Sequence, residues 1–224
     1  MMRSTEAGTC GPEEIEQRSF SIIEAELSRI HAEAGISRQR SPLEETIVRR
    51  VIHATADFDF DANLVFTHEA ERIALELVCN GPTIITDTNM ALAGINTGAL
   101  EFFAGRALCF MGDADVAEAA REHNTTRASA SIDKASRLQE PLVFAIGNAP
   151  TALFRIHHLL REGLLQARLV IACPVGFVNV VEAKELFLDS GLPCIVARGR
   201  KGGSAVAAAI VNALLYYGKQ MTDP

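Results

Sequence analysis

A histidine close to an arginine is the first feature of this sequence that could carry acid–base chemistry. His53 follows Arg50 by one helical turn, so the two side chains share a face of the expected helix. The carboxyl end of that helix and the acids Asp57 and Asp59 favour the protonated imidazole, whereas Arg50 opposes it. A histidine in this setting can give or take a proton near neutral pH. The alternative is a helix-end histidine that only binds the last carbonyl groups of its helix.

Positive side chains gather in a second place, a glycine-rich stretch near the end of the chain. Arg198, Arg200 and Lys201 lie there within four residues. Such a cluster clamps carboxylate or phosphate groups, or it is a solvated turn. Thr126 and Arg127 lie at the start of another expected helix. They either contact an anion in the same way or only cap the helix.

Further polar residues follow short apolar runs of the kind that form buried strands. Asp87 and Asn89 follow one run, Asn148 and Thr151 follow another, and Ser204 ends the stretch after the last. Each either binds a ligand or caps a turn. The carboxyl ends of parallel strands meet at one edge of an open α/β sheet, where ligands bind. Five such stretches at one edge therefore predict a ligand site there.

The apolar runs alternate with segments of helical periodicity. This alternation predicts an α/β fold with three layers, α/β/α, in which helices cover both faces of a mostly parallel, five-stranded sheet. The expected strands are Thr83–Thr86, Ala107–Met111, Leu142–Ile146, Leu169–Cys173 and Cys194–Ala197. The expected helices between and after them include Val116–His123, Thr151–Arg161, Val180–Leu188 and Ser204–Tyr217.

Helices are also expected before the sheet. One runs from Pro12 to about Ala34, and a second opens with the capping box Ser41-Pro42-Leu43-Glu44 and ends at His53 or the next residue. Residues 57–61 are expected as a loop or short extended piece, and a third helix as starting near Thr67 and ending before Gly81. We expect residues 1–12 to be a flexible tail and residues 13–224 to form one domain.

Composition excludes several classes of protein. Among 224 residues, 21 are Lys or Arg and 28 are Asp or Glu, so the net charge of -7 argues against a broad basic face for nucleic acid. No run reaches the ~20 strongly apolar residues of a membrane span, and the first residues lack the apolar core of a signal peptide. The five cysteines include no Cys-x-x-Cys pair, which favours reduced thiols and a cytoplasmic location.

The sequence also lacks common cofactor and nucleophile motifs. It contains no Gly-x-Gly-x-x-Gly, no P-loop and no Gly-x-Ser-x-Gly elbow. The six histidines form no metal-binding pair at helical spacing. We therefore expect no bound cofactor, no metal site and no covalent nucleophile.

These same stretches resemble the precorrin-8X methylmutase family, including its cobalt-precorrin-8 branch. The similarity extends from about residue 18 to residue 215, and its longest blocks are Gly-Asn-Ala-Pro-Thr-Ala-Leu-Phe and Arg-Gly-Arg-Lys-Gly-Gly-Ser-Ala. The matching segments are Arg18–Phe20, Arg50–Thr55, Thr86–Met90, Thr126–Arg127, Gly147–Phe154, Pro174–Val178 and Arg198–Ala205.

The resemblance implies an isomerase of cobalamin biosynthesis with a flavodoxin-like fold. Such an enzyme moves a methyl group from C-11 to C-12 of a reduced tetrapyrrole, giving hydrogenobyrinate or its cobalt equivalent, cobyrinate, without a redox or methyl-donor cofactor. The resemblance makes His53 the catalytic residue and Ser19 and Arg50 substrate-binding residues. It further implies a homodimer, with handover to neighbouring pathway enzymes as an additional expectation.

The residue-level interpretation is compatible with this expectation. A macrocycle with acetate and propionate groups suits glycine loops, helix N-termini and the cations Arg127, Arg198, Arg200 and Lys201, and its apolar faces suit Met90, Leu153 or Phe177. Two rivals remain at this point: a corrinoid carrier that holds an unstable intermediate, and an α/β enzyme for another anion such as a phosphorylated metabolite.

Overall fold

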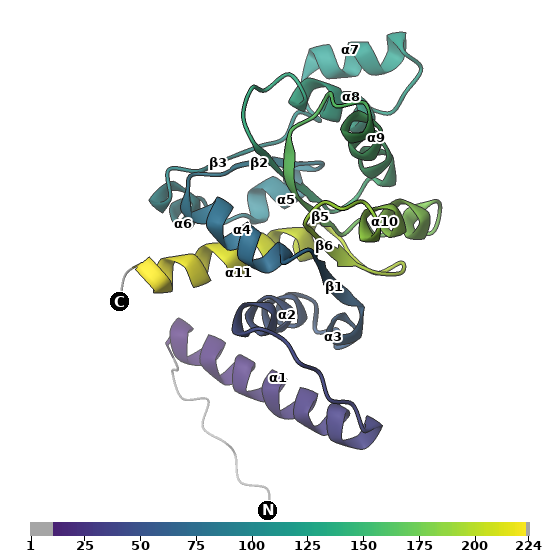
Figure 1. The fold of residues 1–224 in the computed structure, drawn as a ribbon. Coiled ribbons are helices and arrows are strands. Elements are labelled where there is room, and N and C mark those ends of the chain that lie inside the picture. Colours follow the sequence, from purple (N-terminus) through teal and green to yellow (C-terminus); the bar gives the residue numbers. More distant parts are fainter. Residues whose placement is uncertain (1–10, 223–224) are drawn as a thin grey trace, which may run out of the picture. The chain divides into compact units, whose positions relative to one another are not determined.

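The structure is a computed structural model that describes residues 11–222 and divides the chain into two compact units, 1–39 and 40–224 (Figure 1). In the first unit lies α1 (Pro12–Ala34), which ends at Gly35 in the left-handed conformation, with φ of 63°. The helix expected from Pro12 is therefore present. Residues 1–10 of the expected tail lie outside the described residues, and the single domain over residues 13–224 stays a prediction.

A six-stranded sheet forms the centre of the second unit. Its order is β1-β6-β5-β4-β2-β3, in which β2 to β6 are parallel and β1 runs antiparallel to β6. The five parallel strands thus have the flavodoxin-like order, which confirms the expected fold. The strands are β1 (Leu64–Thr67), β2 (Thr83–Thr86), β3 (Arg106–Leu108), β4 (Leu142–Ile146), β5 (Ala167–Ala172) and β6 (Cys194–Ala197).

The sixth strand corrects the expectation of five strands and of a helix starting near Thr67. Leu64–Thr67 forms β1, which pairs with the open edge of β6 and so satisfies backbone groups that would otherwise be free. The hydroxyl of Thr67 also accepts a hydrogen bond from the amide of Cys194 (3.1 Å). Before β1, the expected loop contains the short helix α3 (Phe60–Asn63), and the third expected helix is α4 (Ala70–Cys79).

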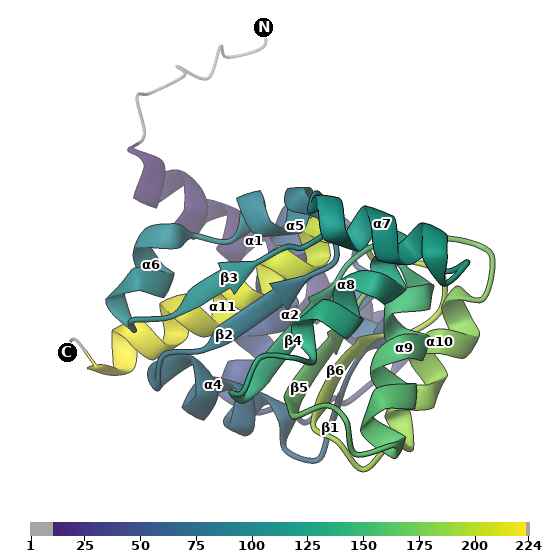
Figure 2. The same cartoon turned by 90° about the horizontal axis from the view of Figure 1, so that it is seen from above.

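Helices cover both faces of the sheet, so the expected three-layer arrangement is confirmed (Figures 1 and 2). One face carries α2 (Pro42–Thr55), α4, α5 (Asn89–Gly94) and the long α11 (Ser204–Thr222), on which α6 (Thr97–Phe102) also packs. The other face carries α8 (Arg127–Ala135), α9 (Pro150–Arg161) and α10 (Val180–Leu188), with α7 (Ala114–Glu122) packed on α8. Across residues 11–222 no helix combines the length and apolarity needed to span a bilayer.

Burial on both faces of the sheet explains why the sequences of the strands are continuous apolar runs. Every residue of β2, β4 and β6 is buried, as expected for a parallel sheet covered on both faces. Between the sheet and α9 and α10, Phe144, Leu153, Ile156 and Phe187 are fully buried. These contacts fix the strands, so that the loops at their carboxyl ends have defined positions.

The entry to α2 follows the sequence signature closely. The amide of Glu44 donates to the Ser41 hydroxyl (3.2 Å), and the Glu44 carboxylate accepts from the Ser41 amide (2.8 Å). Both halves of the expected capping box are therefore present. The helix ends at Thr55, two residues beyond His53, where Ala56 takes the left-handed conformation with φ of 53°.

Candidate functional site

A buried carboxylate links the two strands at which the sheet order reverses. Asp87 follows β2, and its oxygens accept hydrogen bonds from the amides of Gly147 (2.8 Å), Asn148 (2.8 Å) and Ala149 (2.6 Å) after β4. Burial raises the pKa of the Asp87 carboxyl, while the three N–H groups act in the opposite direction. The crevice at such a reversal is where ligands bind in open α/β sheets. Asp87 thus holds the backbone after β4 at the end of the sheet where the strand order reverses.

The start of α11 packs against the same loop. A Cβ atom on residue 147 would lie 2.8 Å from the backbone nitrogen of Ser204, so this close approach needs Gly147. The hydroxyls of Ser204 and Thr88 lie 2.7 Å apart, and Thr88 also caps α5 by accepting from the amide of Ala91 (3.0 Å). The Ser204 hydroxyl is therefore engaged within the chain, whereas Asn89 and Asn148 are exposed beside it.

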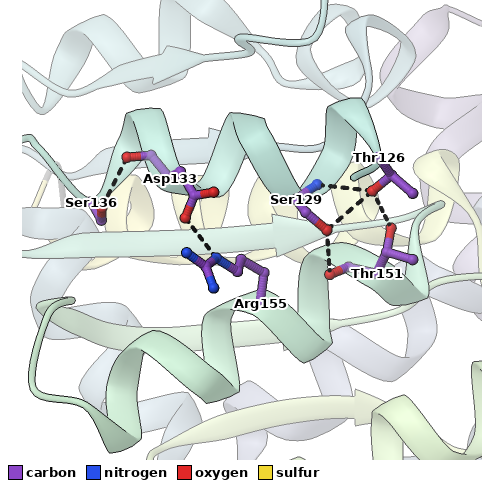
Figure 3. A network of polar contacts seen from close by, with 6 residues as sticks. All are labelled: Thr126, Ser129, Asp133, Ser136, Thr151 and Arg155. Carbon is purple, nitrogen blue, oxygen red and sulfur yellow. Dashed lines mark hydrogen bonds and ion pairs between the residues drawn. The ribbon is translucent and has the colours of Figure 1, made fainter. Parts of the chain in front are cut away.

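Hydrogen bonds join the N-termini of two helices, α8 and α9 (Figure 3). The hydroxyls of Thr126, before α8, and Thr151, in α9, lie 2.9 Å apart. Thr126 also accepts from the amide of Ser129 (3.1 Å), and the Ser129 hydroxyl donates to the Thr151 carbonyl (3.3 Å). Arg127, the first residue of α8, is exposed. The free N–H groups of two helices therefore reach the same edge of the sheet.

Residues 198–203, here called the glycine loop, are bonded to the segment after β5. The amide of Gly203 donates to the Cys173 carbonyl (2.8 Å), and the amide of Gly176 donates to the Arg200 carbonyl (3.2 Å). A Cβ atom on Gly202 would overlap the Cys173 carbonyl oxygen. The loops after β2, β4, β5 and β6 are thus bound to one another, while the segment after β3 pairs with Lys134 of α8 instead.

The three cations of the glycine loop differ in their partners. Arg198 binds Glu185 through two hydrogen bonds (3.0 and 2.9 Å), and Lys201 lies 2.7 Å from Asp57 and 2.6 Å from Asp59. Among the residues that the structure describes, none gives Arg200 an acidic partner. Its guanidinium lies 5.8 Å from the centre of the Phe177 ring instead. Arg200 is therefore the cation of this loop that is ready for an added anion.

His53 is exposed on the last turn of α2. The acids expected to act on its imidazole, Asp57 and Asp59, bind Lys201 instead, and Lys201 holds the pKa of Asp57 below its usual range. A further hydrogen bond joins the Arg198 amide to the Asn63 carbonyl (2.8 Å). The end of the helix that carries His53 is thus attached to the glycine loop.

Arg50 and Ser19, which the resemblance makes substrate-binding residues, contact neighbours within their own units. The guanidinium of Arg50 lies 4.6 Å from the ring centre of Tyr216, roughly 18 Å along α11 from Ser204 at 1.5 Å per residue. Ser19 belongs to the first unit, where its hydroxyl donates to the Ile15 carbonyl (2.9 Å). The roles of Arg50 and Ser19 in substrate binding stay predictions.

Apolar side chains are exposed at the carboxyl edge. Met90 is 73% exposed, Phe177 85% and Val178 76%. Leu153, expected as a further contact for an apolar ligand face, is fully buried in the core, so that expectation is wrong. Of the three residues expected to contact the apolar faces of the macrocycle, Met90 and Phe177 are therefore exposed at this edge.

Sequence reasoning missed a lysine beneath the glycine loop and the pairing of Lys201 with acids. Lys184 lies on α10, and its ammonium donates to the carbonyls of Gly199 (2.9 Å) and Lys201 (2.8 Å). A lone lysine on the apolar side of Val180–Leu188 is the sequence feature that could have drawn attention to it. The Lys201 pairing has no local signature, because its acids lie more than 140 positions earlier in the chain.

Taken together, the fold and this edge define a flavodoxin-like α/β protein whose strand-end loops carry polar and cationic residues near its topological switch point. Comparison with known proteins narrows the class: the family model described as precorrin-8X methylmutase matches residues 14–217. The chain therefore belongs to the precorrin-8X methylmutase family.

Individual relatives agree with this assignment. The chain is 45% identical over 213 residues to the cobalt-precorrin-8 methylmutase of Salmonella typhimurium, covering 92% of this chain and 95% of the relative. It is 37% identical over 196 residues to the precorrin-8X methylmutase of Pseudomonas aeruginosa, covering 87% and 93%. The crystal structure of precorrin-8X methylmutase from Thermus thermophilus superimposes with a TM-score of 0.78 at 34% identity, covering 92% and 98%.

Proposed function

We propose that this chain moves a methyl group from C-11 to C-12 of precorrin-8X or cobalt-precorrin-8, giving hydrogenobyrinate or cobyrinate. The chain is a methylmutase by family, an isomerase of cobalamin biosynthesis, and the family match over residues 14–217 is the observation that carries the proposal. The curated relatives include proteins named for each of the two substrates, so both are candidates for this chain.

His53 supplies the acid–base group in this proposal. A methyl shift within one molecule has no leaving group and needs no external nucleophile. The protein has to hold the macrocycle in a reactive conformation and stabilise the charge that moves during the shift. An exposed imidazole at the end of α2 can donate a proton or hydrogen bond to the macrocycle.

The carboxylates of the macrocycle are anchored by the edge described above. Arg200 and Arg127 offer charge, and the starts of α8 and α9 offer N–H groups. Because the side chains of Asp87, Thr126 and Ser204 are already bonded within the chain, they position the loops in this proposal. The remaining substrate contacts that we propose are Ser19, Arg50, Asn89 and Asn148. We also propose Thr151, Arg198 and Lys201, which would keep their partners in the chain and offer their remaining N–H or O–H donors to the substrate.

We further propose a cytoplasmic homodimer that hands its product to the next enzyme. The described cysteines are free, as in proteins that keep their thiols reduced. A mean hydropathy of +0.15 is compatible with an apolar subunit interface. Light scattering at micromolar concentration should give twice 24.2 kDa, and a monomer would contradict the dimer.

The decisive experiment incubates the purified chain separately with precorrin-8X and cobalt-precorrin-8. Because the proposed reaction is an isomerisation, the product should have unchanged mass, a shifted visible spectrum and a methyl resonance moved to C-12. Binding without rearrangement would instead show a carrier. Neither binding nor rearrangement with both substrates would overturn the proposal in favour of an enzyme for another anion.

A further inference from the structure

Lys184 is a buried cation that the proposed reaction does not use. Its side chain, on α10, is fully buried, and its ammonium donates to the carbonyls of Gly199 and Lys201 at 2.9 and 2.8 Å. Both partners are neutral carbonyl groups. Burying an ammonium without a carboxylate costs considerable free energy. A methionine would fill a similar volume without that cost, so the charge of Lys184 calls for a role beyond packing.

The two carbonyls flank Arg200. The carbonyl of Arg200 itself is held by the amide of Gly176 (3.2 Å), so all three consecutive carbonyls of residues 199–201 have donors. The left-handed turn at Gly199, with φ of 74°, lies within the same stretch. With its backbone held at these points, the loop fixes the position from which the exposed Arg200 side chain extends.

We infer that Lys184 is a positioning residue for substrate binding: it holds the backbone of the glycine loop so that Arg200 meets a carboxylate of the macrocycle. The inference rests on the proposed function, because it assigns Lys184 to the recognition of that substrate. A held arginine loses less conformational entropy when it binds, and the affinity for a carboxylate rises accordingly. Lys184 acts only through the loop and does not touch the substrate.

The protonation state of Lys184 provides an independent readout. Burial lowers the pKa of Lys184 to about 8. The titratable neighbours are the Cys173 thiol at the end of β5, whose own pKa is raised to about 12, and the loop cations Arg198 and Lys201 with their acids. As the pH rises through about 8, the ammonium becomes a neutral amine, whose hydrogen bonds to the two carbonyls are weaker. Substrate affinity should fall over that range.

A double-mutant cycle tests the inference. Lys184→Met should raise the dissociation constant of cobalt-precorrin-8 or precorrin-8X about tenfold, in keeping with the loss of charge-assisted hydrogen bonds. In the Arg200→Ala background the same substitution should change the dissociation constant less than twofold, because its effect passes through Arg200. Lys134→Met is the matched control: Lys134 pairs with Asp113 and Asp115 at the start of α7 and, among the described contacts, has no hydrogen bond to the glycine loop, so its loss should leave binding unchanged.

The outcomes separate this inference from the proposed function. An equal effect of Lys184→Met with and without Arg200, or no effect at all, would overturn the inference while wild-type turnover still supports the function. Failure of the wild type to bind either substrate would instead reject the function. If Lys184→Met does not fold, the pH dependence decides: the wild-type dissociation constant should rise through pH 8 and that of Arg200→Ala should not.

Discussion

The ammonium of Lys201 lies 2.7 Å from the carboxylate of Asp57, so an ion pair connects the glycine loop to the segment that follows the helix carrying His53. Asp59 binds the same ammonium at 2.6 Å. Exposed pairs of this kind contribute only about 0–1 kcal/mol to stability. Their importance here is geometric, because they hold the proposed acid–base group and the proposed anion anchor in one region.

Replacing His53 with alanine should slow rearrangement without unfolding the protein. The side chain is exposed on the last turn of α2, so its removal leaves no core cavity. Turnover should fall by about 10²–10⁴-fold, the usual share of one general acid–base group. Rearrangement rate and dissociation constant should be measured on the same preparation, with His123→Ala, another exposed histidine at a helix end, as the control. Near wild-type turnover would remove His53 from the mechanism.

Arg200→Ala should weaken substrate binding by about 1.5–3 kcal/mol, the range for hydrogen bonds to charged groups. Added salt should weaken the wild type more than the variant, because the lost contact is ionic. Arg106→Ala is a suitable control, since Arg106 starts β3 at the opposite edge of the sheet and pairs with Glu140. Equal affinity of wild type and Arg200→Ala in a spectroscopic titration would show that the loop is only a turn.

Gly202→Ala should displace the glycine loop. The added methyl group would collide with the Cys173 carbonyl and lie 2.8 Å from that of Pro174, and backbone atoms cannot rotate away. Forced insertion of this kind costs about 1–3 kcal/mol of stability. Substrate affinity should fall as well. Gly112→Ala, where a methyl group meets nothing within 4 Å, should leave urea unfolding and binding unchanged; similar behaviour of the two variants would contradict the close packing at Gly202.

Asp87→Asn should destabilise the fold. The carboxylate accepts three backbone N–H bonds, and an amide must turn its NH₂ group toward at least one of these donors. A buried donor left unpaired costs about 1–3 kcal/mol. Asp189→Asn, at the exposed end of α10, is the control. Chemical unfolding that gave equal losses of unfolding free energy for both variants would contradict this stabilising role of the Asp87 carboxylate.

The pH dependence of the Asp87 variant has a definite sign. Burial raises the pKa of Asp87 in the folded state above the ordinary value of 3.8, so the folded protein binds this proton more tightly than the unfolded chain. The stability gained from this difference is complete below pH 3.8 and is lost as the pH rises through the folded-state pKa. The free energy of unfolding of the wild type, relative to Asp87→Asn, should therefore decline on going from acid toward neutral pH.

Local patterns were sufficient to predict most elements of this fold. Three strands have the expected bounds: Thr83–Thr86, Leu142–Ile146 and Cys194–Ala197. They were predictable because a short apolar run between turn residues is typical of a buried strand. The capping box before α2 was equally predictable from the sequence, because its hydrogen bonds join residues only three positions apart. The position of polar residues after the strands correctly indicated one shared edge.

Long-range contacts explain what the sequence could not reveal. The strand β1 has four residues and pairs with β6 some 130 positions later, so its identity depends on an edge that only the folded sheet provides. The sequence around Asp87 indicates a ligand-binding or capping residue. Its bonds to the amides after β4, 60 positions away, appear only in the folded structure. In the sequence, Lys184 is one residue of a helical pattern. Only the folded structure shows its hydrogen bonds to the glycine loop.

The sheet ends on both sides in short strands, β1 with four residues and β3 with three. Long, flat edges invite another chain to add a strand, which is a common route to aggregation. Edges this short offer few free backbone groups, and the exposed Arg106 adds a charge on β3. Extension of the sheet from one molecule to the next into a continuous ribbon is therefore disfavoured.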